Sequence, residues 1–195
     1  PDTPELRAHF GSGNTSSKRQ TPFPMLRLVA LMNVRSHLMV DAQVSPYRRG
    51  EIPLAASFLE RIPDVSITLL DKGFWSADLL LTLQHNGHDR YWLIPERKGL
   101  VQEVIETYGE GDELVRMKVS PQARKKNPAL PSTWQARRVT YAVKSGNKTV
   151  MTSLPADRFS AQQIAQLYQE RWEIELGFRD IKSSILRKAS EAINA

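Results

Sequence analysis

Four polar side chains near the C-terminus have the types and the spacing to bind phosphate and metal. They are Tyr168, Arg171, Glu175 and Lys182. Wound as an α-helix, at about 100° per residue, they fall within an arc of roughly 60°. One carboxylate, which can hold a metal ion, therefore stands among two cations that can contact phosphate and a phenol that can position a phosphate or stack against a base. The pattern suits chemistry on a phosphate ester.

An apolar stripe adjoins these polar residues on the same predicted helix. Its members occupy a second arc of roughly 60°: Leu167, Ile174, Phe178, Ile181 and Ile185. The helix is expected to start with a capping box at Ser160 and Gln163 and to run to about Arg187. The polar residues would then lie at the edge of the core. The alternative interpretation is a solvated ion pair between Arg171 and Glu175, which contributes a few tenths of a kcal/mol.

A second acid, Asp71, follows a predicted strand. The strand begins at Ser66, and Ser76 is a suitable N-cap for a helix over Ala77–Gln84. With a further strand predicted at Asp89–Pro95, this order implies parallel pairing, and ligands bind beyond the carboxyl ends of parallel strands. An Asp in this position is also a common turn former or helix cap, which is the alternative interpretation.

Asp71 and Glu175 would make one site if the fold brings them together. Two neighbouring carboxylates repel each other, so they seldom share a site without a cation. Mg²⁺ prefers oxygen ligands and keeps positions for water and phosphate, and two such ions can activate water or a 3′ hydroxyl at a phosphodiester. We therefore expect the two carboxylates to lie within about 8 Å of each other.

The rest of the sequence divides into an α/β part and a β-rich part. Before Asp71 the predicted segments are a loop with a short helical turn over residues 1–24, an antiparallel hairpin of strands Leu26–Val34 and His37–Val44, and a helix over Glu51–Arg61. Between residues 96 and 156 helical periodicity disappears, and three stretches alternate like strands: Leu114–Val119, Trp134–Val143 and Thr149–Leu154. The proline-rich, basic stretch Pro121–Ser132 is predicted to be a loop.

Composition excludes several classes of protein. The chain of 195 residues has 27 basic and 21 acidic side chains and a pI near 9.7, a balance that suits a polyanionic partner without proving one. The absence of cysteine excludes disulfides and thiolate metal sites and fits a reducing compartment. No apolar run reaches the ~18 residues that span a bilayer. Because the sequence opens on Pro1 without Met, we expect a fragment or a processed product.

The chain resembles a known family at two motifs. The spacing Tyr-x2-Arg-x3-Glu-x6-Lys, which the residues from Tyr168 to Lys182 meet in full, resembles the signature of bacterial transposases of the insertion-sequence-four family. The run Asp71-Lys-Gly73-Phe74 resembles that family's strand-terminal Asp, which is followed by Gly and an aromatic residue. The β-rich section between the motifs resembles the insertion domain of the family.

The resemblance implies an α/β fold with an RNase H-like mixed sheet flanked by helices and a small β insertion before the C-terminal catalytic helix. In these terms the catalytic core comprises residues 1–95 and 157–188. The β-rich insertion subdomain is 96–156, and residues 189–195 form a tail.

The resemblance also implies a function and a set of site residues. Asp71 and Glu175 would be two acids of an Asp-Asp-Glu metal triad that uses Mg²⁺, or Mn²⁺ as a substitute. Tyr168, Arg171 and Lys182 would bind DNA phosphates. The reaction would be DNA strand cleavage and strand transfer in cut-and-paste transposition. The implied partners are transposon-end and target DNA in a synaptic complex of a homodimer, without a membrane, in the bacterial cytoplasm at the nucleoid.

One acid of the implied triad is missing from the sequence. The first Asp should end the first strand of the sheet in an Asp-Gly context, and no such context precedes the predicted hairpin. Asp2 is a poor candidate, and Asp41 has no support from the family pattern. We therefore expect a sheet that lacks its first strand and a chain that is weakly active or inactive. The alternatives are a non-catalytic DNA-binding or regulatory remnant of a transposase, and a nuclease without strand transfer.

Overall fold

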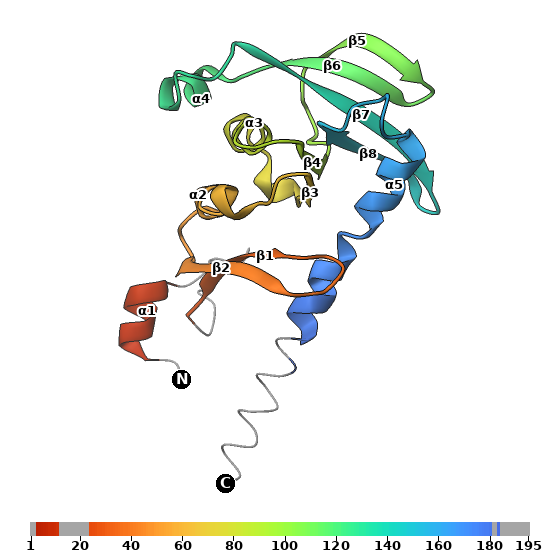
Figure 1. Ribbon diagram of the computed structural model, residues 1–195. Coiled ribbons are helices and arrows are strands. Elements are labelled where there is room, and N and C mark those ends of the chain that lie inside the picture. The colour runs from red at the N-terminus through yellow and green to blue at the C-terminus, as the bar shows by residue number, and fades with distance from the viewer. Residues whose placement is uncertain (1–2, 12–23, 181–182, 184–195) are drawn as a thin grey trace.

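A six-stranded sheet and a separate two-stranded sheet organise the protein (Figure 1). The computed structural model describes residues 3–11, 24–180 and 183. The predicted tail at 189–195 and the predicted helix end near Arg187 lie outside these residues. Within the described part, helices lie beside both faces of the larger sheet, so the predicted α/β class, a mixed sheet flanked by helices, is confirmed.

The two-stranded sheet is the predicted antiparallel hairpin. Strands β1 (Leu26–Met32) and β2 (Met39–Pro46) pair with Leu28 opposite Val44. Successive side chains of a strand point to opposite faces, so Val29 packs into the core while Leu28 and Val44 stay exposed. Helix α1 (Pro4–Phe10), capped by Thr3, lies beside β2 and corresponds to the predicted helical turn.

The α/β part follows the predicted order with one correction. Strands β3 (Ser66–Leu69) and β4 (Arg90–Pro95) are parallel, and helix α3 (Ala77–His85) between them is capped by the Ser76 hydroxyl, as predicted. The predicted helix over Glu51–Arg61 is wrong as one piece: α2 (Glu51–Ala56) ends, and a 3-10 turn, η1 (Leu59–Arg61), follows. The Ser57 hydroxyl donates to the Leu54 carbonyl at 2.7 Å, a local bond that competes with a continuous helix.

The predicted β-rich section continues the same sheet. The strand order is β3-β4-β8-β7-β6-β5, and all contacts beyond the parallel β3–β4 pair are antiparallel. The added strands are β5 (Gln102–Gly109), β6 (Asp112–Lys118), β7 (Thr133–Val143) and β8 (Gly146–Thr152). Because β8 bonds directly to β4, the section 96–156 shares its hydrogen-bond ladder with the core strands.

Two elements of this section were not predicted. Strand β5 is exposed along most of its length, so it lacks the apolar alternation that marks a half-buried strand. Helix α4 (Pro121–Lys126) forms inside the stretch predicted to be a loop, which corrects that prediction. Ser120 caps this helix, and Pro121 occupies its first turn, where a missing backbone N–H costs nothing.

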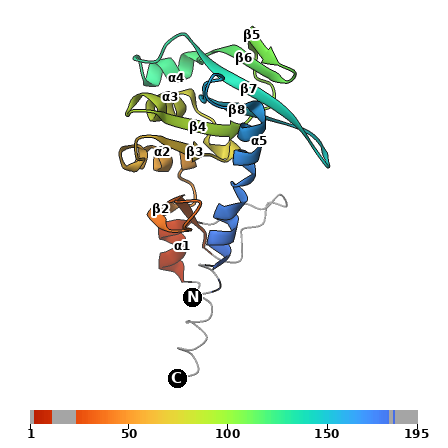
Figure 2. The ribbon, with the colours of Figure 1, turned by 45° about the vertical axis from the view of Figure 1, so that its right-hand side comes forward.

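Alternate residues of β4 pack on opposite faces of the sheet. Trp92 faces α2 and α3, where its ring lies 5.7 Å from that of Trp134, and Leu93 faces the other side. On that other side Leu93 packs with Ile164 of helix α5 (Ala161–Gln169). Figure 2 shows α3 and α5 on the two sides of the strands.

The C-terminal helix is interrupted. Helix α5 starts at the predicted capping box, with Ser160 as its N-cap, but residues 170–171 form a turn before helical residues 172–180. The predicted continuous helix is therefore wrong at this point. The backbone bonds across the turn join residues three apart, as from Arg171 N to Tyr168 O, and this tighter winding rotates the following side chains. No helix of the described chain has the length and apolar character needed to cross a bilayer.

Candidate active site

Asp71 and Glu175 come together around one guanidinium group. Nη1 of Arg171 lies 3.1 Å from Glu175 Oε1 and 4.0 Å from Asp71 Oδ1. The two carboxylate oxygens are therefore no farther apart than the total of these distances, 7.1 Å. This separation agrees with the expected limit of about 8 Å between the two carboxylates.

Asp71 lies beyond the carboxyl end of β3, as predicted. The strand pairing continues to Leu70, whose N–H donates to Leu93 O at 2.9 Å. Asp71 then caps the 3-10 turn η2 (Lys72–Phe74), because its Oδ1 accepts from Lys72 N at 2.9 Å. Asp71 is therefore a helix cap, which was the alternative interpretation of this residue, and the same carboxylate also faces Arg171. Its side chain is 65% exposed, which leaves it accessible to a ligand.

Two aromatic rings also lie close to Arg171. Its Cζ lies 5.9 Å from the ring centre of Tyr168 and 5.5 Å from that of Trp172. Cations are attracted to such ring faces. The Arg171 side chain is only 19% exposed, whereas that of Glu175 is 47% exposed. The Arg171 side chain is thus less exposed than the side chain of either acid that it contacts.

Tyr168 is a neutral phenol in this site. Burial raises its pKa to about 12; the Arg171 cation opposes this shift, and the Asp71 carboxylate adds to it. At neutral pH the hydroxyl therefore keeps its proton and can donate a hydrogen bond. It is unsuited to act as a base.

The donor set fits a hard divalent cation in part. Asp71 and Glu175 supply carboxylate oxygens, the ligand type that Mg²⁺ and Mn²⁺ prefer. Within residues 3–11, 24–180 and 183, no three His, Cys, Asp or Glu side chains form a metal-binding group. Asp41 is ion-paired with Arg61. Asp2 and Lys182 lie outside the described residues.

An open pocket of about 540 Å³ separates the hairpin from the six-stranded sheet. Its walls include the end of β1 from Ala30 to Met32 and the whole of β3. Arg171, in the turn after α5, and Ile174, in the helical segment that follows, also line it. In the described part of the chain, β1 pairs only with β2 and β3 pairs only with β4, so each has an unpaired edge. The candidate site therefore borders a pocket that residues of both strands line.

Two contacts that the sequence did not suggest fix residues 172–180 against the hairpin. His37 Nε2, in the turn between β1 and β2, lies 2.7 Å from Glu173 Oε2. A Cβ added at Gly177 would come within 2.6 Å of Met32 Sδ, so the missing side chain permits a close approach of helix and hairpin.

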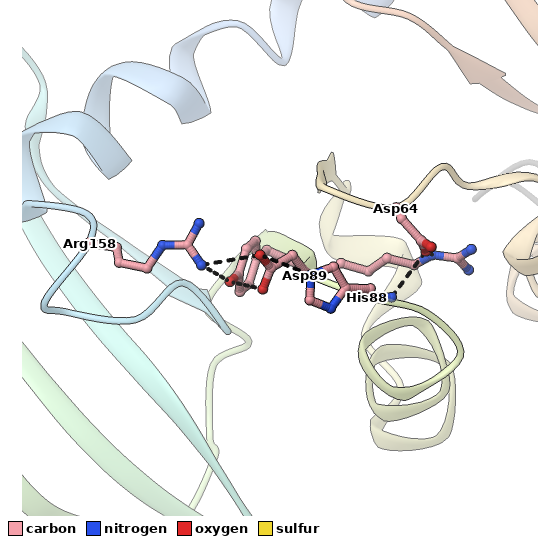
Figure 3. Close-up of polar contacts among 6 residues, drawn as sticks. Asp64, His88, Asp89 and Arg158 are labelled. Carbon is pink, nitrogen blue, oxygen red and sulfur yellow. Dashed lines mark hydrogen bonds and ion pairs between the residues drawn. The ribbon is translucent and has the colours of Figure 1, made fainter.

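A second polar cluster lies at the opposite ends of β3 and β4 (Figure 3). Asp64 accepts from Arg90 Nε at 2.8 Å, and Asp89 accepts from the Tyr91 hydroxyl, also at 2.8 Å. Arg158, just before α5, donates to the same hydroxyl. These bonds lower the pKa of both carboxyls: for Asp64 the main cause is the His88 N–H, and for Asp89 it is Tyr91. The cluster ties the starts of β3 and β4 to neighbouring segments, and it lies away from the strand end that carries Asp71.

Comparison with known proteins adds evidence independent of this geometry. Residues 2–194 match the family described as transposase DDE domain. The chain is 40% identical over 188 residues to transposase InsG for insertion sequence element IS4 of Escherichia coli K12, covering 96% of this chain and 42% of that protein. It is 56% identical over 106 residues to InsZ of the same strain, which is provisionally named a transposase, covering 54% of this chain and 36% of InsZ.

The chain spans less than half the length of these two relatives. Among solved structures, it resembles a chain of the piggyBac transposase synaptic complex with hairpin DNA, with a TM-score of 0.43 and 11% identity. That match covers 84% of this chain and 34% of the other. A likeness of this size supports no inference about function.

Proposed function

The chain belongs to the transposase DDE domain family, and on this premise we propose that Asp71 and Glu175 are two acids of a metal-dependent site that cleaves DNA and transfers strands. The resemblance to insertion-sequence-four transposases, predicted from the signature between Tyr168 and Lys182, is confirmed by the family match and by the likeness to InsG. The observation that carries the proposal is the convergence of the two carboxylates on Arg171 from distant parts of the sequence.

The contacts suggest what each residue contributes. Asp71 and Glu175 would hold Mg²⁺ or Mn²⁺, which when bound supplies a Lewis acid and an activated oxygen nucleophile at a phosphodiester. The planar fork of Arg171 matches two oxygens of a phosphate. The protonated phenol of Tyr168 would donate to a phosphate oxygen. Lys182 keeps its predicted role as a second phosphate-binding cation.

We propose that the hairpin and the six-stranded sheet are two pieces of one RNase H-like core. Residues of β1 and β3 line the same pocket, and each strand has one neighbour in the described part of the chain, which supports a further strand between them. In the order that the resemblance implies, such a strand carries the first acid of the triad. The division into a core of 1–95 and 157–188 and an insertion of 96–156 belongs to the same proposal.

The proposed partners are DNA and a second copy of the protein. A basic excess of 27 over 21 charged side chains supports binding to the phosphate backbone of transposon ends and target. The proposed setting is a synaptic complex of a homodimer in the bacterial cytoplasm, at the nucleoid.

A nicking assay tests the catalytic proposal. Supercoiled plasmid that carries the terminal sequences of the element encoding the chain is incubated with the protein and Mn²⁺ or Mg²⁺. We expect slow nicking that EDTA abolishes and that Glu175→Gln reduces by roughly 100-fold or more, because the substitution removes a metal-binding charge and keeps the size. The matched control is Glu103→Gln, because Glu103 lies on β5, far along the sheet from β3, and pairs with Arg116. This variant should nick like the wild type.

The products separate the remaining alternatives. Binding that weakens with salt but never leads to cleavage would favour a non-catalytic DNA-binding or regulatory module. Cleavage without joined ends would favour a nuclease. Nicking that persists unchanged in Glu175→Gln would contradict the site.

A further inference from the structure

Arg171 contacts both of the carboxylates that would share a cation in the proposed site. Its Nη1 is within 4.0 Å of an oxygen of Asp71 and of Glu175, so one positive charge offsets the repulsion between two negative ones. An ordinary surface Arg extends its head group into water, and exposed ion pairs contribute little. Here the Arg171 side chain is 19% exposed and the side chains of the acids are 65% and 47% exposed, so Arg171 is less exposed than either acid that it contacts.

The surroundings of Arg171 keep it in this position. The rings of Tyr168 and Trp172 lie 5.9 and 5.5 Å from its Cζ and belong to residues on either side of the helical break. The 3-10 winding at residues 170–171 sets the direction of the side chain. The contact of Arg171 with the two acids thus depends on the backbone conformation and on two aromatic neighbours as well as on charge attraction.

We propose that Arg171 is an internal counter-cation that a divalent metal ion must displace from Asp71 and Glu175. The inference rests on the proposed function, since it concerns the same two acids. A metal ion bound to both oxygens would meet the guanidinium at close range, and like charges repel, so the two cations exclude each other. The displaced guanidinium can then contact a phosphate oxygen, which is the role predicted for Arg171. Metal binding and phosphate binding thereby become coupled through one side chain.

The test measures cation affinity without DNA and without turnover. Tb³⁺, an oxygen-seeking ion, is titrated into the full chain, and its luminescence is excited through Trp172, which is 57% exposed beside the site. We expect Arg171→Met to bind Tb³⁺ about tenfold more tightly, because a competing charge is removed. The matched control is Arg116→Met, which removes an Arg from β6, far along the sheet from β3, and should change the affinity less than twofold.

Further variants separate the inference from the function on which it rests. Tb³⁺ binding lost in Glu175→Gln, together with an affinity unchanged or weakened in Arg171→Met, would overturn the inference and leave the metal site intact. If neither Asp71→Asn nor Glu175→Gln changes the Tb³⁺ affinity, both the inference and the proposed metal site are overturned. Trp172→Phe identifies the emission that comes from this site.

A measurement on the unmodified protein covers the case in which Arg171→Met does not fold. The Arg171 Nε–H resonance is followed by NMR while Mg²⁺ alone is added. Displacement predicts a change in its chemical shift and faster exchange with water at the Mg²⁺ concentration that saturates the site. An unmoved resonance at saturation would overturn the inference.

Discussion

At the scale of single residues, Tyr168 has a property that can be measured directly. Burial raises its pKa to about 12, against an ordinary value of 10.0. An absorbance titration at the phenolate wavelength should therefore include a step near pH 12 that Tyr168→Phe removes. A Tyr168 step near pH 10 would contradict the environment described for the site.

The same shift predicts how stability depends on pH in alkali. The folded protein holds the Tyr168 proton more tightly than the unfolded chain, so the contribution is fully present below about pH 10. It is lost as the pH rises through about 12. Phosphate recognition by a protonated phenol should accordingly be insensitive to pH across the neutral range.

At the scale of elements, a buried ion pair connects the outer strands to α5. Arg137 of β7 is 4% exposed and donates to both oxygens of Asp112 on β6, at 2.7 and 2.5 Å. It also donates to Phe159 O at 2.7 Å, just before α5 begins. The pair therefore fixes the start of the helix that leads to Arg171 and Glu175.

Breaking this pair should be costly. Arg137→Met leaves the Asp112 charge buried without its partner, and we expect the free energy of unfolding to fall by about 3–5 kcal/mol. Urea denaturation followed by tryptophan fluorescence measures the loss. Arg138→Met is the matched control, because Arg138 is the next residue on the same strand and is partly exposed. Equal losses in the two variants would contradict the role assigned to Arg137.

The sequence predicted those elements whose signals are local. The N-cap residues Ser76 and Ser160 predict the starts of α3 and α5, and apolar runs predict β3 and β4. The structure has these elements near the predicted positions. Strand β5 depends on pairing with β6, and the residues of β5 alone do not predict this pairing. The turn at residues 170–171 contains no Gly or Pro, so nothing in its composition marks the break.

The same distinction applies to the candidate site. The spacing of the C-terminal motif identified Arg171 and Glu175, and the resemblance to the family added Asp71. The structure brings these three residues together. The spacing of the motif could not reveal that Arg171 contacts both acids, because that contact depends on the winding of the backbone between α5 and residues 172–180. Nor did spacing indicate the contact between His37 and Glu173, which joins distant segments.

At the scale of the whole molecule, the pocket lined by β1 and β3 predicts that adding the proposed strand between them would raise the stability of the protein. An extended chain can be made by adding the InsG residues that directly precede the region matching this one. If they enter as a strand, two unpaired edges gain hydrogen bonds and the apolar lining leaves water, so the thermal midpoint should rise by several degrees.

The control for this experiment is the same extension with prolines at alternate positions. Proline cannot donate to a strand ladder, so this version should leave the midpoint near that of the original chain. Equal midpoints for all three proteins would contradict the proposed strand.

The turn at residues 170–171 also affects the temperature at which the candidate site comes apart. Asp71 is anchored in the sheet, whereas Glu175 lies beyond the turn on a segment fixed to the hairpin by contacts such as those of His37 and Gly177. Proteins open in cooperative units of unequal free energy, and a joint between two units is the natural boundary of such an opening. The carboxylates can therefore separate while the six-stranded sheet remains folded. Amide hydrogen exchange should become fast in residues 172–180 before it becomes fast in β4 or β7, so warming would disassemble the site before the protein melts.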